Sequence, residues 1–163
     1  MNIKSVILLC LVMFPFASSR QAVQRSEVNQ ENVPDEVRSC LRTRPEIEIN
    51  GGINPFLISG DYDGDGITDF AVQVRTKKDQ HKGILICFAR DLAVLVGAGA
   101  ATPWSKGHDD RWPFDSWFLA RKGGKQVSIY PQIKFDALAL VIAVEGGGLV
   151  FWDGKEVHWQ QEE

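Results

Sequence analysis

The feature that most constrains this chain is an acidic nine-residue segment that leads directly into an apolar run. Asp61, Asp63, Asp65 and Asp69 lie in the sequence DYDGDGITD, and residues 70–74 follow with the alternation of a half-buried strand. Four carboxylates this close together repel one another unless a cation lies among them. Calcium takes oxygen ligands at this spacing. We therefore expect this segment to bind Ca²⁺ where the chain enters a strand.

The first seven positions of the segment match the start of an EF-hand calcium loop. Carboxylates occupy positions 1, 3 and 5, Gly66 permits a sharp turn at position 6, and the carbonyl of Ile67 is available at position 7. The end differs, because an EF-hand has a bidentate Glu at position 12 and this chain has Val72 there. It offers Asp69 at position 9 instead. The alternative to an ion site is a solvated Asp/Gly turn that holds no ion.

The pattern Asp-x-Asp-x-Asp-Gly-x-x-Asp resembles the calcium loops of FG-GAP and VCBS-type repeats, as in integrin-type β-propellers, where the loop joins two strands. The match covers residues 59–74. By this resemblance the ligands would be the carboxylates of Asp61, Asp63, Asp65 and Asp69 and the carbonyl of Ile67. The chain has one copy of the motif, and no Phe-Gly or Gly-Ala-Pro signature precedes it.

A propeller needs at least four blades of several tens of residues each, so 163 residues exclude it, and integrin-like adhesion does not carry over. The chain as a whole also looks like small secreted bacterial proteins of unknown function that place one such loop between a short helix and a strand meander. In a turn between strands, the expected role of Ca²⁺ is to stabilise the fold.

The first residues are typical of a secretory signal peptide. Lys4 supplies a positive charge, residues 6–16 are apolar, and Ala17 and Ser19 are small residues before a cleavage point. The apolar run is about half of the roughly 20 residues that a membrane-spanning helix needs. We therefore expect a secreted or periplasmic protein that has no membrane attachment after cleavage.

The remaining chain is expected to form one domain. Residues 1–19 are assigned to the signal peptide, 20–32 to a flexible polar N-terminus, and 33–163 to a single β-rich calcium-binding domain. Cleavage leaves Cys40 and Cys87, which can pair in an oxidising compartment. Both positions also suit small buried hydrophobic side chains, and this interpretation is favoured over a disulfide.

The expected fold is mainly β (α+β), with an antiparallel curled or two-layer sheet and one short N-terminal helix at residues 34–43. That segment has acidic residues in its first turn, basic residues towards its end and apolar residues at helical spacing. A glycine turn is expected at residues 146–148, and Asp153-Gly154 predicts a hairpin. The predicted strands are residues 56–59, 70–74, 84–89, 92–96, 117–120, 127–130, 138–144, 149–152 and 155–160.

Residues 97–124 are rich in tryptophan, glycine and charge, and we expect a long surface excursion there. The segment from Trp104 to Trp117 offers aromatic surfaces for an unknown protein or glycan ligand. The alternative, that the tryptophans only attach the loop to the sheet, is favoured over ligand binding. The net charge of −3 and the lack of a basic stripe give no reason to expect a nucleic-acid partner.

The function expected from these features is that of a non-enzymatic, calcium-stabilised binding or interaction module. The alternative is a small hydrolase or lyase that uses His108 with Asp109 or Asp110 as acid–base groups. No catalytic residue is assigned, because no nucleophile motif accompanies that cluster. Ca²⁺ is the only cofactor expected. His81 and His158 are expected to face solvent.

Overall fold

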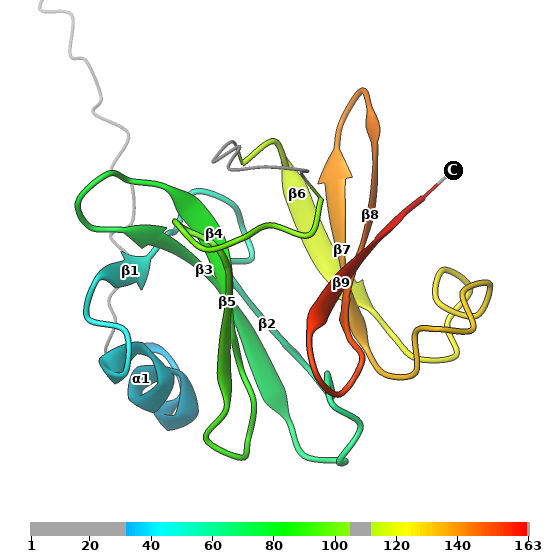
Figure 1. The fold of residues 1–163 in the computed structure, drawn as a ribbon, viewed down its shortest axis with the longest axis horizontal. Coiled ribbons are helices and arrows are strands. Elements are labelled where there is room, and N and C mark those ends of the chain that lie inside the picture. Colours follow the sequence, from blue (N-terminus) through cyan, green and yellow to red (C-terminus); the bar gives the residue numbers. More distant parts are fainter. Residues whose placement is uncertain (1–31, 105–111, 163) are drawn as a thin grey trace, which may run out of the picture.

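Two antiparallel sheets form the protein, whose computed structural model describes residues 32–104 and 112–162 (Figure 1). The mainly β fold is therefore confirmed. The predicted signal peptide, and all but the last residue of the flexible N-terminus, lie outside the described residues. The elements are α1 (Asp35–Arg42), β1 (Ile47–Ile49), β2 (Leu57–Gly60), β3 (Asp69–Thr76), β4 (Lys82–Cys87), β5 (Ala93–Gly97), β6 (Ser116–Ala120), β7 (Ala137–Ile142), β8 (Gly146–Trp152) and β9 (Val157–Gln161).

β3 is the organising strand of the first, five-stranded sheet. It pairs with both β1 and β2 along one edge and with β4 along the other, and β5 follows β4. β2 and β3 form a hairpin in which Gly60 pairs with Asp69, so the acidic segment connects these two strands. This confirms that the acidic loop joins two strands.

β3 and β4 are buried on both faces because the first sheet is covered on both sides (Figure 1). The expectation of a half-buried strand at residues 70–74 is therefore wrong, because Gln73 is as fully buried as Val72 and Val74 on the other face. Val72, Val74 and Leu85 pack beneath α1, whereas Ile84 and Ile86 pack against the second sheet. A strand buried on both faces reads as a nearly continuous apolar run, which is why the sequence of β4 predicts a central strand.

The second sheet has the order β6-β7-β8-β9 and contributes Trp117, Leu138 and Leu140 to the core between the sheets. Its other face is covered by the connection from β6 to β7, where Val127 and Ile133 pack on the sheet. The predicted strand at residues 127–130 is therefore wrong. These residues form consecutive turns, in which backbone N–H groups bond to carbonyls three or four residues earlier.

The glycine turn predicted at residues 146–148 is also wrong, because these residues begin β8 and the turn lies at residues 143–145. A Cβ on Gly147 would lie 2.2 Å from the carbonyl oxygen of Leu140, and one on Gly148 would lie 2.4 Å from that of Gln160. The glycines are thus explained by close backbone approach within the sheet.

A disulfide joins Cys40 of α1 to Cys87 of β4, with their Cα atoms 5.9 Å apart. The preference for two unpaired cysteines is therefore wrong. Both side chains are buried in the cluster between α1 and the first sheet, which brings them face to face. The sequence pattern indicates burial for each cysteine separately, but only the packing of α1 on β4 brings the two sulfur atoms together.

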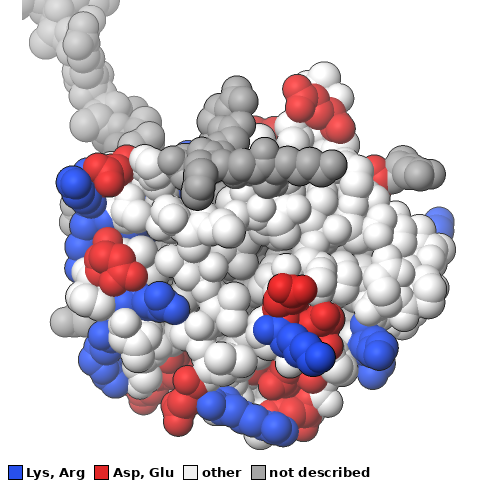
Figure 2. Space-filling view, in the orientation of Figure 1, with Lys and Arg blue, Asp and Glu red and all other residues white. Residues whose placement is uncertain are grey.

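On the face shown in Figure 2, charged residues lie along the left side and in the lower part, where one mixed group of both signs stands inside the outline. Acidic and basic side chains are interspersed there, and that face presents no extended basic patch. Among the described residues, no helix has the length and apolar character that crossing a membrane requires.

Candidate metal centre

The acidic loop occupies residues 61–68, between β2 and β3. Two glycines give it its shape: Gly64 and Gly66 have φ angles of +79° and +81°, which L side chains rarely adopt. Gly66 therefore has the role expected at position 6 of the loop. Gly64 has a second reason to be glycine, because a Cβ there would lie 2.2 Å from the ring of Phe135.

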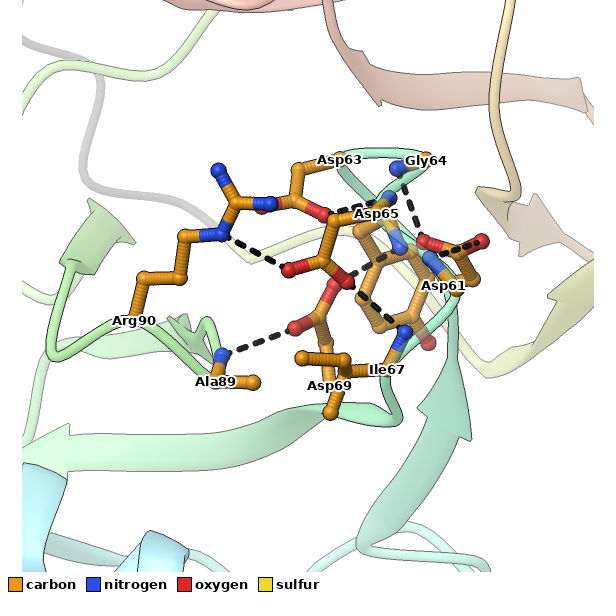
Figure 3. Close-up of polar contacts among 10 residues, drawn as sticks. Asp61, Asp63, Gly64, Asp65, Ile67, Asp69, Ala89 and Arg90 are labelled. Carbon is orange, nitrogen blue, oxygen red and sulfur yellow. Dashed lines mark hydrogen bonds and ion pairs between the residues drawn. The ribbon is translucent and has the colours of Figure 1, made fainter.

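The structure brings Asp61, Asp63 and Asp65 together at this loop. Each offers a carboxylate oxygen, and the three oxygens lie within 4.8 Å of one another. Their orientation is set by backbone N–H groups within the loop. Asp61 accepts from Gly64 and Gly66, at 2.7 and 3.2 Å. Asp63 and Asp65 each accept from the residue two positions later, at 3.1 and 2.7 Å (Figure 3).

Asp69 lies deeper than the other three aspartates and is completely buried. One carboxylate oxygen accepts the N–H of Tyr62 at 2.8 Å, and the other accepts that of Ala89 at 2.9 Å. Asp69 is not part of the group of three close carboxylates. Its hydrogen bonds attach the base of the loop to the β4–β5 turn (Figure 3). Burial raises its pKa, against the opposing effect of the two N–H bonds.

Ile67, the other predicted ligand, lies within the loop with an exposed side chain, and its N–H donates to Asp65. A cation-binding loop uses the carbonyl at this position, so an exposed apolar side chain is compatible with the assignment.

Arg90 is a residue of the site that sequence reasoning missed. Its side chain reaches from the β4–β5 turn to the loop, where Nε lies 2.9 Å from a carboxylate oxygen of Asp65 (Figure 3). The Asp65 side chain is nearly buried, whereas that of Arg90 is mostly exposed. Arg90 thus supplies one positive charge to a cluster of carboxylates. No local motif marks this residue, which follows Asp65 by 25 positions.

Asp136 was also missed, and it connects the loop to the second sheet. One of its carboxylate oxygens accepts the N–H of Asp61 at 3.1 Å, and the other accepts that of Lys122 at 2.8 Å. The backbone N–H of Asp136 in turn donates to the carbonyl of Asp61. The loop is therefore held at the junction of the two sheets. Because 75 residues separate Asp136 from Asp61, only the fold reveals the contact.

The described aromatic residues of the predicted excursion at residues 97–124, whose last part forms β6, lie mostly in the core. Trp117 and Phe114 are buried, and the Trp117 indole N–H donates to the carbonyl of Pro55. Trp104 and Trp112 keep part of their surface exposed, and their rings meet edge to face at 5.8 Å. Of these four aromatic side chains, only Trp104 and Trp112 are available to a ligand.

The histidines and carboxylates considered as alternative sites are placed only in part by the structure. His108, Asp109 and Asp110 lie outside the described residues. His158 is partly exposed and contacts Asp153. His81 is partly buried in the β3–β4 turn.

Comparisons with known proteins add no family to this geometry. No protein-family model, no curated protein and no solved structure matches the chain.

Proposed function

We propose that this protein is an exported, calcium-stabilised β domain that acts as a non-enzymatic binding module. The observation that carries the proposal is the convergence of Asp61, Asp63 and Asp65, whose carboxylate oxygens lie within 4.8 Å of one another on a single loop. Oxygen-rich loops of this kind suit Ca²⁺, which accepts six to eight oxygen ligands in flexible geometries. Backbone carbonyls and water would complete the ligand set.

The position of the loop supports a structural role for the ion. Asp69 attaches the loop to the β4–β5 turn, and Asp61 attaches it to Asp136, which directly precedes β7 of the second sheet. An ion that orders the loop would stabilise the folded chain, because the unfolded chain lacks the site. The disulfide supports an oxidising location outside the cytosol, where such bonds persist.

We assign ligand contact to the exposed parts of Trp104 and Trp112, and we propose a protein or glycan as the ligand. Partly exposed aromatic rings that are fixed by packing lose little freedom on binding.

Thermal unfolding with Ca²⁺ and with a chelator tests the proposal. Asp63→Asn removes one charge but keeps an oxygen that accepts the Asp65 N–H. Asp79→Asn is the matched control, because Asp79 is an exposed residue of the β3–β4 turn. At 100 times its dissociation constant, a ligand that binds only the folded chain adds about 2.7 kcal/mol.

We expect Ca²⁺ to raise the melting temperature of the wild type and of Asp79→Asn, and to have a much smaller effect on Asp63→Asn. If all three proteins respond equally, or if the wild type does not respond, the assigned ligands are wrong.

A further inference from the structure

A second group of metal-ligating side chains lies at the end of the β8–β9 hairpin, apart from the acidic loop. Asp153, Glu156 and His158 each offer one ligand atom, and these atoms lie within 4.8 Å of one another. The group differs in chemistry from the acidic loop, because it includes an imidazole nitrogen. Its three residues come from one turn and the strand that follows it, so a single hairpin carries the group.

The hairpin turn fixes the carboxylate of Asp153. Its Oδ1 accepts the N–H groups of Lys155 and Glu156, at 2.8 and 2.9 Å. The other oxygen, Oδ2, lies 2.8 Å from Nε2 of His158. One oxygen therefore holds the turn together while the other is directed towards the imidazole.

The imidazole ring of His158 is held by its neighbour across the strands. His158 pairs with Phe151, and the two rings stack with centroids 5.4 Å apart and planes inclined by 28°. This arrangement directs Nε2 towards both carboxylates, with Oε1 of Glu156 at 3.8 Å. A nitrogen ligand is thus oriented by packing outside the group itself.

One imidazole nitrogen and two carboxylate oxygens form a donor set for borderline divalent cations such as Zn²⁺, whereas Ca²⁺ takes oxygen ligands. Zinc bonds of about 2.0–2.1 Å in a tetrahedral site separate the ligand atoms by roughly 3.3 Å. The observed separations of 2.8 and 3.8 Å lie on either side of this value. Glu156 is largely exposed, so its side chain has room to adjust.

We propose that Asp153, Glu156 and His158 form a site for Zn²⁺ or a similar borderline divalent cation. The ion binds Nε2 of His158 and one oxygen of each carboxylate, and water fills the remaining position. The metal-bound imidazole is neutral, with its proton on Nδ1, and the ion takes the place of the direct contact between Nε2 and Asp153. The site is independent of the acidic loop.

Calorimetric titration of the metal-stripped full chain with ZnCl₂, in excess Ca²⁺, tests the proposal. We expect one zinc per chain for the wild type and at least a tenfold loss of affinity for His158→Gln and for Glu156→Gln. His81→Gln is the matched histidine control, and Asp63→Asn is the control for the acidic loop. Both controls are expected to bind zinc as the wild type does.

Imidazole ¹⁵N spectra of the wild type provide a second test that does not depend on how the variants fold. Zinc should shift the Nε2 resonance of His158 before those of the other histidines. The proposal is overturned if the wild type binds no zinc, if His158→Gln binds it normally, if Asp63→Asn abolishes binding, or if another histidine responds first.

Discussion

The acidic loop contains two glycines whose replacement separates backbone strain from a steric collision. Gly64 and Gly66 have nearly the same positive φ, but their surroundings differ. A Cβ at Gly66 meets nothing within 4 Å, whereas one at Gly64 would lie 2.2 Å from Cδ1 and 2.3 Å from Cε1 of Phe135. Alanine at either position has the same backbone problem, and only one of the two alanines also meets the aromatic ring.

The expected costs follow from these two contributions. Placing alanine in the left-handed region costs about 1–2 kcal/mol, so Gly66→Ala should destabilise the protein by about that amount. Overpacking adds about 1–3 kcal/mol when a neighbour has to move, so Gly64→Ala should cost about 2–5 kcal/mol. Chelator should be present, so that differences in Ca²⁺ binding do not enter the comparison.

Urea unfolding followed by circular dichroism measures both costs, and Phe135→Ala identifies the source of the difference. In the Phe135→Ala background the collision is absent, so Gly64→Ala and Gly66→Ala should cost nearly the same. The reasoning fails if the two alanine variants already have equal stability in the wild-type background. It also fails if removal of the Phe135 ring leaves the additional cost of Gly64→Ala unchanged.

Three further predictions concern the disulfide, a buried phenol and the ion pair at the loop. Reduction of the Cys40–Cys87 bridge, which joins residues 47 positions apart, should lower the free energy of unfolding by about 4 kcal/mol in urea titrations with and without reductant. Burial raises the pKa of the Tyr62 phenol in the folded chain, so the free energy of unfolding should fall as the pH rises above 10. Followed by circular dichroism, this fall should be smaller in Tyr62→Phe than in the wild type. Arg90→Gln should bind Ca²⁺ more tightly in calorimetry, because the arginine no longer competes for a carboxylate.

Each of these three predictions has an outcome that would contradict it. If reductant does not change the urea midpoint of the wild type, the bridge does not stabilise the fold. The Cys40→Ala/Cys87→Ala variant is the control for effects of the reductant itself. Equal alkaline unfolding of wild type and Tyr62→Phe would show that the phenol is not responsible. Weaker Ca²⁺ binding by Arg90→Gln would mean that Arg90 organises the loop instead of competing with the ion.

The sequence predicts those parts of the fold in which local pattern and environment agree. The alternation in residues 70–74 and the two-sided apolar run of β4 correctly indicate strands, and the glycine at position 6 correctly indicates a turn. The pattern misleads at residues 127–130, because Val127 is apolar for a different reason: it packs over the second sheet from a turn. Period-two alternation cannot distinguish an apolar strand from an apolar covering segment.

Contacts between distant segments were beyond the reach of the sequence. Nothing near Asp136 or Arg90 indicates that either residue meets the acidic loop, because both are placed by the packing of other elements. The pairing of Cys40 with Cys87 likewise depends on where α1 lies on the first sheet. Aspartate spacing, in contrast, is a local property, and this is why Asp61, Asp63 and Asp65 were found together.

The bridge between α1 and β4 has a topological consequence. It closes a covalent ring of residues 40–87, which contains β1, β2, β3, β4 and the acidic loop, whereas β5 and all four strands of the second sheet lie outside the ring. In the oxidised but unfolded chain, the segment that carries the carboxylates therefore has fewer accessible conformations, while residues of β6 to β9 are not restricted by the bridge. Contacts within the ring therefore cost less loop-closure entropy than contacts outside it. The ring thus favours early formation of the part that contains the proposed calcium ligands.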